Sequence, residues 1–280
     1  EVRLTGEAPV RSKEWPDGRK RDRALCRWNL GVCHVADVVV FAVPIPLLNQ
    51  QNGLRRVFGR TPPRGWRDKL VIDICSTKVE PLKAFAGLKG ASIIGTHPMF
   101  GPKVKSLHGQ TVFVCPVQPV DNNPILQRRL EVRQKWLHGF WEARGVNVVE
   151  IAPPEHDAFV PAVQFGVLLA MLIYAQGLRK ADANLNDLMA CGTPNSRILC
   201  ARLARMISPG MLATYTNLTF ENPNNRQWVD EALVVLTRLL PGGQPAQATE
   251  LTSDAIANLM QRVPVDTVYL HSLPDLVKRP

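Results

Sequence analysis

The pattern of apolar positions divides the chain into two parts. In the first part, short runs rich in Val and Ile are bounded by turn residues and alternate with longer segments of helical spacing. We predict strands over residues 1–5, 37–44, 70–75, 91–95, 111–116 and 146–151, with helices over 46–59, 79–89 and 123–145. This alternation predicts an α/β fold for residues 1–152, with a doubly wound, parallel sheet.

The second part lacks comparable strand-like runs. Apolar positions recur at helical spacing over residues 158–183, 184–190, 197–207, 211–216, 227–240 and 246–261, so we predict an all-helical domain over residues 153–280. The stretch FGVLLAMLIYA (165–175) is apolar almost all round, which predicts burial on every side at the interface of a homodimer. It is too short to span a bilayer, so we expect no membrane contact.

Composition and charge narrow the class of protein. The chain is 45% hydrophobic and 21% charged, as in ordinary soluble proteins. Its six cysteines show neither a CxxC pair nor metal-ligand spacing, and no signal peptide opens the chain, so we predict a cytoplasmic protein without a metal. The net charge of +10 comes from basic stretches without aromatic or zinc motifs, which argues against nucleic acid and favours a small polyanionic substrate.

The loop GTHPMFGP (95–102) contains the strongest candidate for chemistry. His97 follows the predicted strand 91–95, and Pro98 restricts it to an extended backbone. Ligands of open parallel sheets bind outside the carboxyl ends of the strands, and histidine is the side chain best suited to act as a base near neutral pH. The alternative is a loop histidine hydrogen-bonded to backbone.

This loop, together with ADVVVFAVPI, IDICSTK, SLHGQTVFVCP, EHD and TPNSRILCARLAR, resembles the prephenate dehydrogenase family. The likeness is greatest to the dehydrogenase half of the bacterial chorismate mutase–prephenate dehydrogenases, and it covers most of the chain. It implies a Rossmann-type first domain and oxidative decarboxylation of prephenate to 4-hydroxyphenylpyruvate in tyrosine biosynthesis, with hydride transfer to NAD(P). FGVLLAM (165–171) stands where relatives often carry a further histidine, so 4-amino-4-deoxyprephenate or arogenate is an alternative substrate. A non-catalytic sensor or scaffold is the alternative of another class.

The resemblance also implies roles for single residues. His97 matches the catalytic base, and Ser76 matches the serine that bonds the substrate hydroxyl or this histidine, although Ser76 suits a helix N-cap equally well. Lys78 either attracts a substrate carboxylate or is solvated. Arg205 matches the arginine that binds the ring carboxylate of this dicarboxylate, whereas Arg197 is expected to order the site or the dimer. We interpret His156, in EHD, as a structural residue at a helix start.

The cofactor expectations rest on the same resemblance. Val43 and Pro44 end the strand 37–44 beside the expected NAD site, and Glu7 follows the strand 1–5 where an acidic residue selects NAD. Arg11 nearby leaves NADP open. The family's glycine-rich turn after the first strand is absent, so we expect that the first βα unit is missing and that the chain as given binds NAD poorly.

Overall fold

A computed structural model describes residues 35–43, 66–85, 87–101, 104–119, 123–181, 184–206 and 221–238, together with the single positions Gly31, Cys33, Leu48 and Leu54. The chain divides into two compact units, Glu1–Val160 and Pro161–Pro280. The predicted strand 1–5 and the predicted helices 211–216 and 246–261 lie outside the described residues. Of the predicted helix 46–59 only Leu48 and Leu54 are described, and both are helical.

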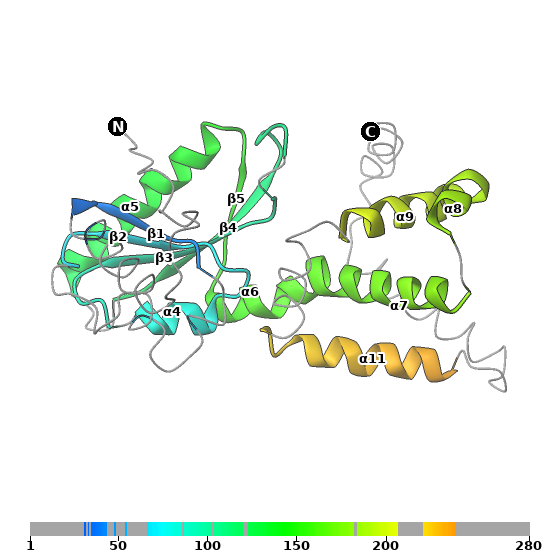
Figure 1. Cartoon of the computed structure of the whole chain (residues 1–280). Helices are drawn as coiled ribbons and strands as arrows, with labels where there is room; N and C mark the ends of the chain where they lie inside the picture. The colour runs from blue at the N-terminus through cyan, green and yellow to red at the C-terminus, as the bar shows by residue number, and fades with distance from the viewer. Residues whose placement is uncertain are drawn as a thin grey trace, which may run out of the picture. The chain divides into compact units, whose positions relative to one another are not determined.

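Five strands form one sheet in the first unit (Figure 1). They are β1 (Val38–Phe41), β2 (Leu70–Asp73), β3 (Ser92–Pro98), β4 (Thr111–Val117) and β5 (Asn147–Glu150), in that spatial order. β1, β2 and β3 are parallel to one another, and β5 is parallel to β4. β4, however, runs antiparallel to β3. The α/β fold is therefore confirmed, but the sheet is mixed and not wholly parallel.

Helices cover both faces of this sheet, because alternate strand residues point to opposite sides. Figure 1 shows α5 (Pro124–Glu142) on one face and α4 (Val79–Phe85) on the other. Leu70 and Ile72 of β2 pack in the core cluster that contains Leu130 and Leu137 of α5. Val71, between them, packs in the cluster that contains Phe85 of α4. This is the layering expected of a doubly wound fold.

Among the described residues, the second unit is helical. It contains the π-helical segment η1 (Pro161–Phe165), α7 (Gly166–Lys180), α8 (Leu185–Cys191), α9 (Pro194–Met206) and α11 (Asn225–Arg238). η1 begins at Pro161, which has no N–H to continue the α-helical hydrogen bonds. The preceding helix α6 (Pro153–Val160) falls in the first compact unit, eight residues beyond the predicted boundary (160 − 152), because it buries His156, Asp157 and Val160.

The helical segment Pro153–Lys180 is long and apolar enough to cross a membrane by length and composition, and it is the one such segment in the described part of the chain. The apolar stretch 165–175, which is too short to span by itself, lies inside this longer segment. Core helices of soluble proteins share these properties. Only 28% of its most apolar window is buried, so much apolar surface is left exposed.

Candidate active site

The parallel strands bring three chain segments to one edge of the sheet. Phe41, Asp73 and Gly95 lie opposite one another in register, so the residues that follow them emerge side by side. Val43 follows β1, and the Cys75 thiol contacts its carbonyl oxygen at 3.7 Å. The turn 74–78 follows β2 and leads into α4. This carboxyl edge is where open α/β sheets bind ligands.

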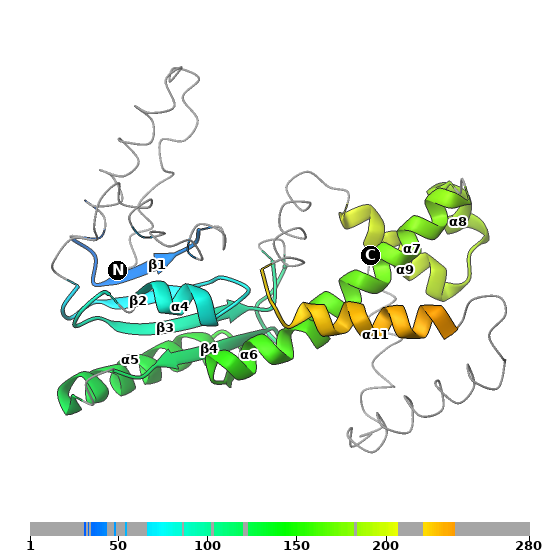
Figure 2. The same cartoon turned by 90° about the horizontal axis from the view of Figure 1, so that it is seen from below.

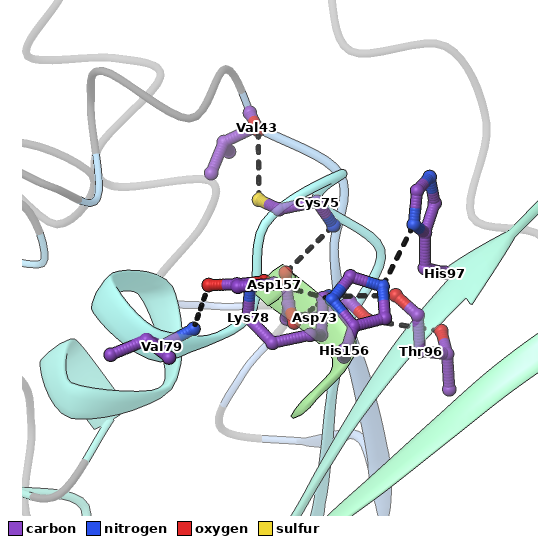
Figure 3. A network of polar contacts seen from close by, with 9 residues as sticks. All are labelled: Val43, Asp73, Cys75, Lys78, Val79, Thr96, His97, His156 and Asp157. Carbon is purple, nitrogen blue, oxygen red and sulfur yellow. Dashed lines mark hydrogen bonds and ion pairs between the residues drawn. The ribbon is translucent and has the colours of Figure 1, made fainter. Parts of the chain in front are cut away.

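His97 lies at this edge as the penultimate residue of β3. The strand extends to Pro98, past the predicted end at Gly95, because β4 pairs with it and places Phe113 opposite His97. The His97 side chain is buried, and its Nδ1 lies 3.0 Å from Nε2 of His156 (Figure 3). The other ring nitrogen, Nε2, points away from the network drawn in Figure 3.

His156 is held in turn by its neighbour on α6. Its ring is fully buried, and its Nδ1 lies 2.8 Å from Oδ1 of Asp157. The Asp157 carboxylate also accepts hydrogen bonds from the backbone N–H groups of Lys78 at 2.7 Å and Val79 at 2.9 Å. These two donors lie at the start of α4, whose positive end favours a carboxylate. Asp157 therefore caps α4, so the interpretation of Ser76 as its N-cap is wrong.

Lys78 lies inside the protein and its ammonium group is bound by groups of the chain. Its Nζ forms an ion pair with Asp73 and donates to the Thr96 carbonyl oxygen at 2.7 Å. Both charged side chains are completely buried, so the alternative that Lys78 is solvated is wrong. Gly95 makes room for it, because a Cβ there would lie 3.0 Å from Cδ of Lys78. The carboxylate that Lys78 binds in this structure is Asp73.

These neighbours determine the charge of His97. Burial, the adjacent His156 and the Lys78 ammonium, in that order, lower the pKa of His97 well below the ordinary value of 6.5. The His97 ring is therefore neutral at physiological pH, which is the form that accepts a proton. In the described part of the chain, no group of three or more His, Cys, Asp or Glu side chains is placed to hold a metal.

The other predicted site residues are placed as follows. Ser76 is half-buried in the turn 74–78, and the described partner of His97 is His156, not Ser76. Arg197 belongs to the second unit, where its guanidinium donates to the Ala190 carbonyl oxygen at 3.1 Å and joins α9 to α8. Arg205 lies on the same helix α9, but its side chain is outside the described part. Pro44 and Glu7 also lie outside the described residues.

Sequence reasoning missed three members of the network. His156 was interpreted as structural, and Asp73 and Asp157 were assigned no place beside His97. The EHD motif could have indicated His156 and Asp157, since adjacent His and Asp side chains at the start of a helix can both lie at one site. Asp73 ends a buried strand, where a carboxylate needs a cationic partner.

A five-stranded sheet with helices on both faces and a buried histidine at the carboxyl edge of its parallel strands places the first unit in the α/β class. The comparisons with known proteins are more specific. The family model for the prephenate dehydrogenase nucleotide-binding domain matches residues 26–136. This match confirms the resemblance predicted from the motifs.

Relatives extend the similarity beyond this domain. The chain is 25% identical over 201 residues to a probable arogenate/prephenate dehydrogenase of Methanocaldococcus jannaschii, over 71% of this chain and 42% of that protein. It is 30% identical over 173 residues to the T-protein of Enterobacter agglomerans, over 62% of this chain and 42% of that protein. The chain thus spans less than half the length of these relatives.

A solved structure confirms the fold. The crystal structure of prephenate dehydrogenase from Aquifex aeolicus, in complex with hydroxyphenyl propionate and NAD+, superposes with a TM-score of 0.56 at 16% sequence identity. The superposition covers 86% of this chain and 79% of that chain. At this identity the likeness concerns the fold alone.

Proposed function

We propose that this protein is a prephenate dehydrogenase. In this reaction the hydrogen on the hydroxyl-bearing ring carbon of prephenate leaves as hydride to NAD, the hydroxyl proton leaves to a base, and loss of carbon dioxide makes the ring aromatic. The product is 4-hydroxyphenylpyruvate, a precursor of tyrosine. The family match of residues 26–136 and the names of the relatives support this class of reaction.

The observation that carries the proposal is the environment of His97. A base must be unprotonated and must lie where the substrate binds. His97 meets the first condition because its pKa is lowered, and its place at the carboxyl edge of β3 supports the second. Ser76, in the adjacent turn, is proposed to hydrogen-bond the substrate hydroxyl.

Charge complementarity supports a dicarboxylate substrate. The chain carries a net charge of +10, which attracts anions. Arg205 is proposed to bind the ring carboxylate as a bidentate guanidinium pair, with Arg197 ordering the turn between α8 and α9. Lys78 is the weakest of the proposed substrate ligands, because Asp73 and Thr96 already bind its ammonium group.

NAD, when bound, supplies the hydride acceptor. The chain fits this cofactor in part. Val43 lies where β1 ends, beside the turn after β2, on the edge of the sheet where dinucleotides bind. Pro44 and Glu7 are proposed to extend this contact to the ring and the ribose. A glycine-rich turn for the pyrophosphate has no counterpart in the 280 residues.

Arogenate and 4-amino-4-deoxyprephenate are the alternative substrates on the same scaffold. One relative is named for both arogenate and prephenate. The stretch FGVLLAM, around the start of α7, buries Leu168 and Met171 and offers no titratable side chain to the substrate. A substrate that differs by one polar group therefore suits the same reaction centre.

The test is oxidation of prephenate, arogenate and 4-amino-4-deoxyprephenate by the protein expressed from its full coding sequence, with NAD or NADP. We expect reduced cofactor and 4-hydroxyphenylpyruvate from prephenate. His97→Gln should lower kcat by about 10²–10⁴-fold while KM changes little, because a positioned base contributes that much. His108→Gln, at an exposed histidine, is the control. Cofactor binding without turnover of any of the three substrates would favour the non-catalytic alternative.

A further inference from the structure

Asp157, His156 and His97 are linked by two buried contacts. Their geometry indicates which nitrogen of each imidazole carries the proton. A neutral imidazole has one N–H and one lone pair, and its hydrogen bonds decide which nitrogen has which. Both rings are almost completely buried, so exchange with water does not set their tautomers. The contacts within the chain must do so.

The first link is between Asp157 and His156. Nδ1 of His156 lies 2.8 Å from a carboxylate oxygen, which can only accept. A lone pair on Nδ1 would face this oxygen and be repelled, so Nδ1 carries the proton. Asp157 cannot turn away, because the backbone N–H groups of Lys78 and Val79 hold its two oxygens.

The second link follows from the first. With its proton on Nδ1, neutral His156 presents a lone pair at Nε2, and this atom lies 3.0 Å from Nδ1 of His97. A hydrogen bond at this distance needs a donor, so His97 carries its proton on Nδ1. The lone pair of His97 is then on Nε2, the nitrogen that points away from the network in Figure 3.

We propose that His156, oriented by Asp157, is a positioning residue that holds His97 in the Nδ1–H tautomer and thereby makes Nε2 of His97 the proton acceptor. The tautomer assignment rests on the contacts alone, and its use in catalysis rests on the proposed function. As the substrate O–H bond breaks, its electron pair forms the carbonyl, the hydrogen on the same carbon leaves with its electron pair as hydride to NAD, and the hydroxyl proton moves to Nε2 of His97. The Nδ1–H of His97 stays hydrogen-bonded to His156, so the ring keeps its orientation as the proton arrives at Nε2.

Phe113 and Phe159 restrict the orientation of the His97 and His156 rings. The Phe113 ring packs edge-on against His156 with centroids 5.3 Å apart, and Phe159 packs on Phe113 at 5.9 Å. His97 and His156 themselves meet edge to face at 5.2 Å. Neither imidazole can rotate without displacing an aromatic ring.

The test is the tautomer of His97, measured by long-range ¹H–¹⁵N correlation in the 280-residue chain labelled with ¹⁵N-histidine. Six histidines give a spectrum that single His97→Gln and His156→Gln variants assign. We expect protonated Nδ1 and unprotonated Nε2 for both His97 and His156 at neutral pH. A His97 protonated on Nε2 in the wild-type chain would overturn the proposal.

Substitutions then separate positioning from packing. His156→Phe removes the acceptor, so His97 should lose its fixed tautomer, and kcat should fall by about 10²-fold with KM little changed. His156→Gln places a carboxamide oxygen near the former Nε2 and should restore the tautomer and part of kcat. His108→Phe should change neither. An unchanged His97 tautomer in His156→Phe would contradict the proposal, whereas the expected tautomers without any dehydrogenase activity would contradict only the proposed function.

Discussion

At the scale of single residues, His97 is suited to accept a proton because three neighbouring features oppose its charge. Burial removes water from the ring, and the neighbouring His156 and the Lys78 ammonium further lower the pKa of His97. The result is a neutral histidine whose hydrogen bond to His156 orients it. A base of lowered pKa is unprotonated at neutral pH but intrinsically weak, so the contribution of His97 depends on its position beside the substrate.

This environment predicts a pH dependence of stability. In the unfolded chain His97 takes up a proton below about pH 6.5, whereas in the folded protein, beside His156 and Lys78, it stays neutral to a much lower pH. The unfolded state therefore gains protons first, and stability is lost as pH falls from about 6.5 towards the lowered pKa, by up to about 1.4 kcal/mol per pH unit.

Urea unfolding between about pH 5 and pH 8 measures this contribution against His97→Gln, which cannot titrate. Below pH 6.5, the unfolding free energy of the wild-type protein should fall more steeply with decreasing pH than that of the variant. Above pH 6.5, the two free energies should change in parallel. Equal slopes below pH 6.5 would show that His97 does become charged in the folded protein.

The buried ion pair gives a second prediction. Lys78→Met leaves the Asp73 carboxylate buried without its cation, which should cost about 3–5 kcal/mol of unfolding free energy. Adding Asp73→Asn should recover much of this loss, because no uncompensated charge is left. Lys83→Met, at an exposed pair with Glu80, should change stability by less than about 1 kcal/mol. If Lys78→Met lowered the unfolding free energy no more than Lys83→Met, the assignment of a buried Lys78–Asp73 ion pair would be contradicted.

At this scale the sequence predicted His97 because a histidine before proline at a strand end is a local pattern. It did not predict His156 as the partner, because 59 residues separate the two and the contact depends on where α6 packs. The same holds for Asp157, which appeared to belong to its own helix but caps α4. Contacts between distant segments depend on tertiary packing, which the local pattern does not specify.

At the scale of elements, the apolar runs predicted β1 to β5 and the helices α4 and α5 to within a few residues. The direction of β4 was not predictable, since an apolar run is the same for a parallel and an antiparallel strand. The antiparallel pairing has a consequence for the site. It extends β3 to Pro98 and places Phe113 beside His97.

One arginine joins these elements. Arg133 of α5 donates to the Lys69 carbonyl oxygen at 2.7 Å and to Oγ of Ser92 at 3.0 Å, so it ties the helix to the starts of β2 and β3. It also donates to the carbonyl of Asp68, which has a left-handed backbone at φ 68°.

Arg133→Gln should therefore destabilise the protein by about 1.5–3 kcal/mol, since charge-assisted bonds are lost and the buried Ser92 hydroxyl loses its partner. Arg128→Gln, on the exposed side of the same helix, should cost less than about 0.5 kcal/mol. Thermal or urea unfolding of both variants measures the difference. Equal effects would mean that α5 is held by its apolar face alone.

At the scale of the whole molecule, the described helices of the second unit expose much apolar surface. On α11 this surface comprises four consecutive residues, each 41–56% exposed: Leu233, Val234, Val235 and Leu236. On α7 it comprises Val167, Leu172 and Ile173. Soluble monomers rarely expose so many large apolar side chains on neighbouring turns, and such surface is typical of an interface. We propose that a second copy of the chain covers it.

Self-association tests this proposal. Sedimentation velocity or light scattering over micromolar concentrations should show a homodimer, and Leu233→Glu with Leu236→Glu should weaken it by more than about 10-fold, because charges would enter an apolar contact. Gln227→Glu adds a charge at an exposed polar position of the same helix and should leave the dimer intact. A monomer at every concentration would contradict the proposal. Binding of the wild-type chain to phosphatidylcholine vesicles, lost in the double variant, would instead assign the apolar helices to a lipid surface.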